Sequence, residues 1–356
     1  MPGIRILGTG SYQPQKKVVN EDFTSFIETS DEWITTRTGM KERFVSNGEP
    51  TWFMGAQAAK SAISAAGISP EDIGVIIDTS VSPDYYTPSM SCMIQRETGA
   101  VNAMTIDVNC ACAGCVYAID MAKRYLQTDK DIKYALVVAN ENLTKITDYT
   151  DRSTCVLFGD GAAAMVIERA DNAVYSSFLG ADGNGAKYLF ARSIPPANAF
   201  MTGEGKVDDG FPESNSHYLY QDGREVYKFA TKALPSALTK AAEKIDFELT
   251  RLNVIIPHQA NVRIIETAAK NLGISMDKFI INLDKHANTS SASIPIALHE
   301  AVTEGKIKSG DLVGLVGFGA GLTFGAIIFE FLTTGQSVDC RRVIVYNIDY
   351  GVRLIS

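Results

Sequence analysis

Three cysteines lie close together in the segment Cys110-Ala-Cys112-Ala-Gly-Cys115, which follows a strand-like run at residues 106–108. The small residues among them leave room for a substrate. A cysteine at the start of a helix faces unpaired backbone N–H groups, which favour the thiolate and its attack on an acyl carbonyl. Cysteine is also among the most buried residue types, so a simple packing role stays open.

Two of the four histidines follow runs that resemble strands. His258 lies in Pro257-His258-Gln-Ala-Asn261, directly after the apolar run at residues 254–256, and His286 lies two residues before Asn288. A histidine near an asparagine can donate hydrogen bonds to a thioester oxygen or transfer protons. A histidine near a strand end is more often structural, so that alternative stays open as well.

Three pairs of segments recur in the same order, which predicts two copies of one α/β unit. Residues 69–77 and 248–256 each suggest a helix, a short loop and a buried strand, at an offset of 179. The dipeptide before the cysteines corresponds to Leu283-Asp284 before His286, at an offset of 177. Two Phe-Gly-x-Gly motifs, at 158–161 and 318–321, each run into an apolar strand.

The continuously apolar runs at 134–139 and 312–316 predict strands with helices on both faces of a parallel or mixed sheet. We therefore predict an α/β fold with an N-terminal half at residues 1–175 and a C-terminal half at 176–331. The uncharged run at 312–329 imitates a membrane span, but its five glycines favour two buried strands joined by a tight turn.

Two stretches fall outside this repeat. Between Asp182 and Asp222 the chain is rich in proline, glycine and aspartate, and a loop this long is usually a lid, a binding loop or an interface. Residues 332–356 have no counterpart in the first half. They are expected to be either one extra strand or a frayed tail.

Composition excludes several classes of protein. With 46% hydrophobic residues the chain can bury large cores, which excludes intrinsic disorder. The net charge of −8 argues against a nucleic-acid binder that works through bulk charge. Six cysteines, half of them clustered, favour a reducing cytoplasm over a disulfide framework, and the N-terminus shows no secretory signal. Zinc is disfavoured because no second cysteine pair lies at ligand spacing.

The chain closely resembles the β-ketoacyl-acyl-carrier-protein synthase III family of the thiolase-like superfamily, from Ile4 to Phe331. The motifs that carry the resemblance are Thr29-Ser-Asp-Glu-Trp33-Ile-Thr-Thr-Arg37-Thr-Gly, Ala111-Cys112-Ala113-Gly114, Phe158-Gly-Asp-Gly161, Pro257-His258-Gln-Ala-Asn261-Val-Arg263, His286-Ala-Asn288-Thr-Ser and Phe318-Gly-Ala-Gly321. The resemblance implies a thiolase-like fold with two pseudo-duplicated halves in αβαβα layers. It also implies a cytoplasmic, homodimeric condensing enzyme that initiates fatty acid synthesis.

The resemblance assigns catalysis to Cys112, His258 and Asn288. Cys112 would take an acyl group from acyl-CoA, and the other two would hydrogen-bond the thioester oxygen of malonyl-ACP, the malonylated acyl carrier protein, as CO₂ leaves. The backbone N–H groups of Cys112 and Ala320 would form the oxyanion hole. No metal and no cofactor beyond the coenzyme A thioester substrate is expected. We also expect the Cys112 thiol to react fastest with an alkylating reagent, because of its helix-start position.

The family's substrate-binding positions also have counterparts. Trp33 and Arg37 would enclose the adenine of coenzyme A, and the remaining coenzyme A positions match Arg152, Tyr227 and Asn261. The basic patch that docks the acidic carrier protein matches Lys228, Arg263 and Lys270. On a chain of net charge −8, such docking should weaken with salt.

Some positions depart from the family pattern. Ala320 replaces a glycine, and Thr87 stands where many members carry a phenylalanine that reaches the partner's acyl pocket, which hints at a roomier pocket here. The loop at 182–222 is longer than usual. These departures keep an alternative open: a relative with the same catalytic residues that condenses or transfers acyl groups in a secondary-metabolite pathway. A partner subunit without a nucleophile is disfavoured, because Cys112 is present.

Overall fold

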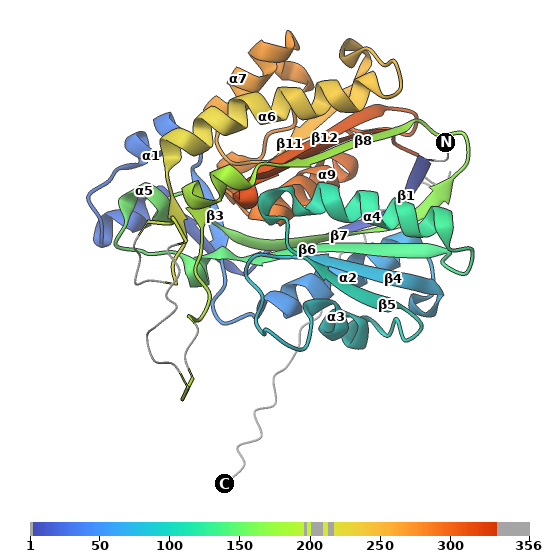
Figure 1. Cartoon of the computed structure of the whole chain (residues 1–356), viewed down its shortest axis with the longest axis horizontal. Coiled ribbons are helices and arrows are strands. Elements are labelled where there is room, and N and C mark those ends of the chain that lie inside the picture. Colours follow the sequence, from blue (N-terminus) through green and yellow to red (C-terminus); the bar gives the residue numbers. More distant parts are fainter. Residues whose placement is uncertain (1–2, 196–197, 201–208, 213–216, 333–356) are drawn as a thin grey trace.

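Two β-sheets lie one above the other in the computed structural model, with helices outside both and between them (Figure 1). The structure describes residues 3–195, 198–200, 209–212 and 217–332. The first sheet has the order β1-β7-β6-β4-β5. Its strands are β1 (Gly3–Tyr12), β4 (Ile73–Thr79), β5 (Met104–Val108), β6 (Tyr134–Asn142) and β7 (Asp160–Ala170).

The second sheet repeats this order as β8-β13-β12-β11. These strands correspond to β1, β7, β6 and β4, respectively. Its strands are β8 (Tyr175–Ala181), β11 (Val254–Pro257), β12 (Leu312–Gly319) and β13 (Thr323–Glu330). In both sheets the pair at the second and third places is antiparallel and the next pair is parallel. The prediction that 312–329 forms two buried strands is confirmed.

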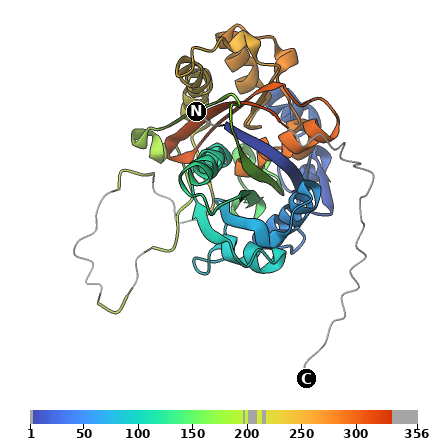
Figure 2. The same cartoon turned by 90° about the vertical axis from the view of Figure 1, so that its right-hand side faces the viewer.

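Helices fill three layers around these sheets, as Figures 1 and 2 show. The outer face of the first sheet carries α2 (Thr51–Ala66) and α3 (Met90–Thr98), and that of the second carries α6 (Gly223–Glu243) and α7 (Val262–Leu272). The central layer holds α4 (Gly114–Thr128) and α9 (Ser293–Thr303). The predicted αβαβα order is confirmed.

Small residues bring the outer helix α2 close to its sheet. A Cβ atom on Gly8 or Gly10 of β1 would lie 2.4 Å from the backbone of α2, so only glycine permits this approach. The central layer is different, because its core combines both halves: Val116 and Ile119 of α4 share one buried cluster with Ile294 of α9. Since the halves share this core, the division near residue 175 stays a prediction. The chain passes between the sheets after Ala170 and before Tyr175.

One part of the repeat differs from its prediction. The dipeptide Ile106-Asp107 lies in β5, but its counterpart Leu283-Asp284 lies in the short helix α8 (Leu283–His286). A single parallel bridge between Ile255 and Phe279 stands where the second sheet would have its fifth strand. The match in sequence therefore marks the same corner of the fold without the same strand.

The stretch between Asp182 and Asp222 is not wholly irregular. It begins with a 3₁₀ turn at Gly183–Tyr188, and β9 (Leu189–Phe190) pairs with β10 (Tyr220–Gln221). Parts of it, at 196–197, 201–208 and 213–216, lie outside the described residues, as does the predicted tail from residue 333 onward. The remaining small elements are β2 (Lys16–Val19), β3 (Glu42–Val45), α1 (Asp31–Thr38) and α5 (Arg152–Cys155).

The length and hydropathy of the helices bear on whether the chain could cross a membrane. Within the residues that the structure describes, none of the helices has the length and apolar character needed to cross a bilayer.

Candidate active site

Cys112 lies in a sharp corner between β5 and α4. Asn109 follows β5, and its Oδ1 accepts a hydrogen bond from the backbone N–H of Ala111 at 3.3 Å. Ala111 has a φ of 48°, a left-handed conformation that non-glycine residues rarely adopt. A 3₁₀ turn at Ala111–Ala113 then leads into α4, which leaves Cys112 half-buried at the positive end of that helix.

Asn288 lies in the matching corner of the second half. Its Oδ1 accepts a hydrogen bond from the backbone N–H of Ser290 at 2.8 Å, and Ser290 has a φ of 47°. A 3₁₀ turn at Ser290–Ala292 then leads into α9. Because the oxygen of the Asn288 amide is engaged, its orientation is fixed and its N–H₂ group remains as the donor.

His258 follows β11 and is buried at 2% exposure. Its Nδ1 lies 2.7 Å from the Ser293 hydroxyl, which also accepts a 3.4 Å hydrogen bond from the backbone N–H of Gln259. That arrangement favours donation of the Ser293 proton to Nδ1, so that Nε2 carries the imidazole hydrogen. Burial lowers the pKa of His258 to about 3, and the ring is therefore neutral near pH 7.

One cavity of about 680 Å³ brings these groups together. Cys112, His258 and Asn288 all line it, with Ala320 and mostly apolar side chains around them. The end of β12 approaches Cys112 closely: a Cβ atom on its last residue, Gly319, would lie 2.5 Å from the Cys112 nitrogen. The structure thus joins the three predicted catalytic side chains and both predicted oxyanion residues at a single site.

The resting state of Cys112 depends on burial as well as on the helix start. The pKa of its thiol is raised to about 12, mainly by burial and to a smaller extent by the negative charge of Glu141. The helix start favours the thiolate, but burial opposes it, and in the free protein the loss of solvation outweighs the helix dipole. The expectation that Cys112 is alkylated fastest stays a prediction; among the cysteines that the structure describes, Cys92 is the exposed one.

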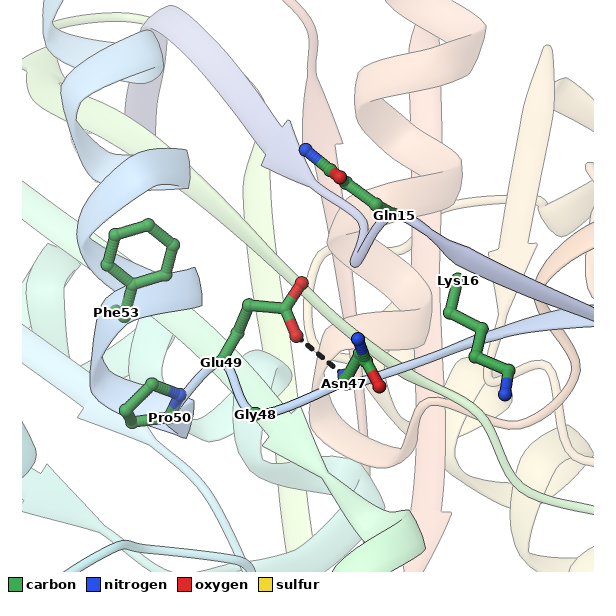
Figure 3. Close-up of a pocket in the computed structure, with 7 residues that line it drawn as sticks. All are labelled: Gln15, Lys16, Asn47, Gly48, Glu49, Pro50 and Phe53. Carbon is green, nitrogen blue, oxygen red and sulfur yellow. Dashed lines mark hydrogen bonds between the residues drawn. The ribbon is translucent and has the colours of Figure 1, made fainter. Parts of the chain in front are cut away.

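A second hollow, of about 490 Å³, lies beside the start of α2. Figure 3 shows its lining, in which the Glu49 carboxylate turns toward Asn47. That carboxylate accepts hydrogen bonds from the Asn47 N–H at 2.6 Å and from the Ser46 hydroxyl at 3.2 Å. Its acidic group is therefore occupied by its own loop, and the hollow offers no nucleophile.

Comparison with known proteins agrees with this geometry. Family models described as 3-oxoacyl-[acyl-carrier-protein] synthase III and its C-terminal part match residues 106–183 and 242–331. A β-ketoacyl-[acyl-carrier-protein] synthase III from Clostridium acetobutylicum is 45% identical over 332 residues, which cover 93% of this chain and 99% of the relative. The chain belongs to the β-ketoacyl-acyl-carrier-protein synthase III family.

Solved structures of synthase III proteins share the fold. The structure from Aquifex aeolicus has a TM-score of 0.84 at 38% identity and covers 92% of this chain and 100% of its own. A structure described as the priming β-ketosynthase of the R1128 polyketide biosynthetic pathway has a TM-score of 0.83 at 32% identity, covering 92% of this chain and 96% of its own. These matches confirm the predicted thiolase-like fold and the family resemblance.

The predicted coenzyme A residues of this synthase III chain surround one end of the cavity. Trp33, Arg37, Tyr227 and Asn261 line it, and the Arg37 and Arg152 guanidinium groups lie 4.5 and 4.8 Å from the centre of the Trp33 ring. The Asn261 amide is already engaged, because it caps α7 and donates to the Arg37 carbonyl at 3.0 Å. An adenine ring that stacks on Trp33 would therefore compete with these two guanidinium groups for the ring.

The predicted carrier-protein residues lie on the outer helices α6 and α7 of the second half. Lys228, Arg263 and Lys270 are exposed. Lys228 pairs with Glu225 at 2.5 Å, and Arg263 donates to the Thr36 carbonyl at 2.6 Å. The Glu225 carboxylate offsets the charge of Lys228, whereas Arg263 keeps its charge because its acceptor is a neutral carbonyl.

His286 does not join the site, although its spacing before Asn288 suggested a role. It is absent from the cavity lining, and its Nε2 lies 2.5 Å from the Glu300 carboxylate, with the Phe44 ring on one side. Among the residues that the structure describes, no three histidine, cysteine or acidic side chains are grouped to hold a metal ion.

Three residues that support the site were not predicted from the sequence. Glu141 lies in the polar end of β6, where the strand is still fully buried after its apolar run at 134–139. An acidic residue soon after such a run was a usable signal, because a buried charge needs partners. Ser290 and Ser293 gave no comparable signal, since serine is common in any loop. Their roles depend on which groups the fold places around them.

Proposed function

We propose that this protein is a β-ketoacyl-ACP synthase III that condenses an acyl-CoA starter with malonyl-ACP and so initiates fatty acid synthesis. The observation that carries the proposal is the common cavity of Cys112, His258 and Asn288. Family membership adds support, because relatives named synthase III match nearly the whole chain. The protein would be an acyltransferase that depends on acyl-CoA and needs no metal.

In the first half-reaction, the Cys112 sulfur attacks the thioester carbonyl of acyl-CoA. The new carbon–sulfur bond forms as the bond to the coenzyme A sulfur breaks, and coenzyme A leaves with the thiol proton. The negative oxygen formed in between would accept hydrogen bonds from the backbone N–H groups of Cys112 and Ala320. The product is an acyl-cysteine.

In the second half-reaction, malonyl-ACP loses CO₂, and the electron pair of the broken carbon–carbon bond enters an enolate. The Nε2–H of His258 and the N–H₂ of Asn288 would donate to the enolate oxygen. A neutral His258 suits this role, because its low pKa keeps it a hydrogen-bond donor without a full charge. The enolate carbon then attacks the acyl-cysteine, which gives a 3-oxoacyl-ACP and frees Cys112.

The exposed edge of the first sheet supports a homodimer. Met104 and Asp107 of β5 are exposed, and in the part of the chain that the structure describes β5 pairs with β4 alone. An open strand edge with an exposed methionine is a surface that a second copy can pair with. Docking of the carrier protein on α6 and α7 and a cytoplasmic location belong to the same proposal.

The alternative is a priming enzyme of a secondary pathway. It is favoured by the likeness to the R1128 priming β-ketosynthase. It is also favoured by Thr87, an exposed residue that directly follows two tyrosines. The two functions share their chemistry and differ in the starter. The choice of acyl group therefore separates them.

The decisive experiment is intact-mass spectrometry after mixing the protein with acetyl-, isobutyryl- or octanoyl-CoA, with Cys112→Ala as control. We expect a gain of one acyl group that disappears in the variant. The preferred acyl group would identify the starter class, and malonyl-ACP should then discharge it. If no starter loads, or if Cys112→Ala still loads, the acyl-CoA-dependent function is wrong.

A further inference from the structure

Ser290 is a buried residue beside the nucleophile whose hydroxyl has no hydrogen-bond partner. It is 1% exposed and lines the cavity, and its backbone has a φ of 47°. Both features cost free energy: glycine would adopt this φ without strain, and a buried hydroxyl normally finds a partner. Such a combination at a substrate cavity indicates a group whose partner forms during the reaction.

Two short turns hold Ser290 near Cys112. The turn at Ser290–Ala292 packs against the turn at Ala111–Ala113, and a Cβ atom on Gly114 would lie 3.5 Å from the Ser291 Cβ. From this place the Ser290 hydroxyl can reach two groups. Burial raises the pKa of both the Cys112 thiol and the Glu141 carboxyl, and a hydrogen bond from Ser290 to either group would oppose that rise.

Glu141 faces the same corner from β6 and is fully buried. Its carboxylate accepts hydrogen bonds from both halves of the chain, from Ser82 Oγ at 2.6 Å and Ser291 Oγ at 2.7 Å. Its charge opposes a second negative charge on Cys112. Asp78 of β4 is a further buried carboxyl whose pKa is raised by burial and in part by the Glu141 charge, and the neutral His258 lines the same cavity as Cys112.

We propose that Ser290 is a positioning residue for the nucleophile, whose hydroxyl donates a hydrogen bond to the Cys112 sulfur when that sulfur is a thiolate, while the buried Glu141 carboxylate disfavours a second negative charge at this corner. When the thiol ionises, its proton passes to water and the Ser290 hydroxyl hydrogen, which has no acceptor in the resting protein, turns to the sulfur. No other bond changes. The inference rests on the proposed function only in taking Cys112 as the nucleophile.

The test is the pH dependence of Cys112 alkylation by iodoacetamide, followed at that cysteine by peptide mass spectrometry. In Ser290→Ala the profile should move to higher pH, with an alkylation rate about tenfold lower at pH 8, because a hydrogen bond to a charged group is lost. Glu141→Gln should move the profile in the opposite direction. The matched control is Thr289→Val, since the Thr289 hydroxyl is also buried without a partner but lies outside the cavity lining.

An unchanged profile in Ser290→Ala overturns the proposal, as does an equal shift in Thr289→Val. A shift of Glu141→Gln toward higher pH overturns the part assigned to Glu141. If Ser290→Ala does not fold, as judged by circular dichroism, Ser290→Gly replaces it, because glycine relieves the strained φ and lacks the hydroxyl. Iodoacetamide needs no acyl-CoA, so the profile can shift while acyl loading fails, which would contradict the proposed function alone.

Discussion

The two halves of the chain build the same corner from different side chains. In the first half, Asn109 accepts from the backbone of Ala111 and the chain turns through a φ of 48°; in the second, Asn288 accepts from the backbone of Ser290 and the chain turns through a φ of 47°. Each corner leads into a helix of the central layer. The backbone is thus duplicated, while one corner presents a thiol and the other an amide.

The comparison shows where chemistry entered a repeated fold. A strained corner costs free energy in both halves, so the surrounding structure must hold it in both. With the backbone fixed in this way, a few side-chain changes are enough to make one corner nucleophilic and the other a hydrogen-bond donor. The halves also differ at their sheet edges, where the first ends in β5 and the second in the bridge at Phe279.

The largest expected effect comes from two equivalent glycines, Gly159 and Gly319. A Cβ atom would lie 2.5 Å from the His286 oxygen in Gly159→Ala and 2.5 Å from the Cys112 nitrogen in Gly319→Ala. Both variants should lose roughly 1–3 kcal/mol of stability in chemical denaturation, because backbone must move. Acyl loading should fall more than a hundredfold in Gly319→Ala, since an oxyanion donor shifts. Equal losses of loading in the two variants would contradict the assignment of the reaction to the first corner.

The second prediction concerns His258, the buried histidine of the second half. Its pKa is lowered from 6.5 to about 3, which means that the folded state favours the neutral form of the imidazole ring. Stability from this group is therefore complete above pH 6.5 and is lost as the pH falls toward 3. At pH 4.5 the loss should be about 2–3 kcal/mol. Urea denaturation at pH 6.5 and 4.5, compared with the non-titrating His258→Gln, measures it; an identical pH dependence in both proteins would contradict a buried neutral histidine.

Much of this arrangement could be predicted from the sequence, for identifiable reasons. Repeated apolar runs set the strands, and the motifs around Cys112, His258 and Asn288 marked the cavity. The pKa of Cys112 could not be predicted, because it depends on burial and on Glu141, which is far away in the sequence. The role in the site that the sequence suggested for His286 is not observed, for a related reason. Its spacing in the sequence places it near Asn288, but only the fold shows that its ring turns to Glu300.

The third prediction sharpens the contrast between these two histidines. Glu300 accepts from His286 and, at 2.9 Å, from the Asn282 side chain, and these contacts lower the pKa of its carboxyl. Glu300→Gln keeps the shape but removes the charge, and should cost about 1–2 kcal/mol of stability in urea denaturation. Acyl loading should change less than twofold. A large loss of loading at unchanged stability would place His286 in the reaction after all.

The smallest expected effect comes from charge reversals on two equivalent outer helices, α6 of the second half and α2 of the first. Lys228→Glu on α6 reverses a charge in the proposed carrier-protein patch, whereas Lys60→Glu on α2 makes the same exchange on the opposite face of the molecule (Figure 1). Both lysines already pair with a glutamate, so stability should change by less than about 1 kcal/mol in either variant. Only Lys228→Glu should raise the KM for malonyl-ACP, by about two- to fivefold at low salt, and the difference should shrink at high salt because the attraction is screened. Since the two exchanges alter the net charge equally, a matching rise in Lys60→Glu would mean that the carrier protein responds to overall charge and not to a patch on the second half.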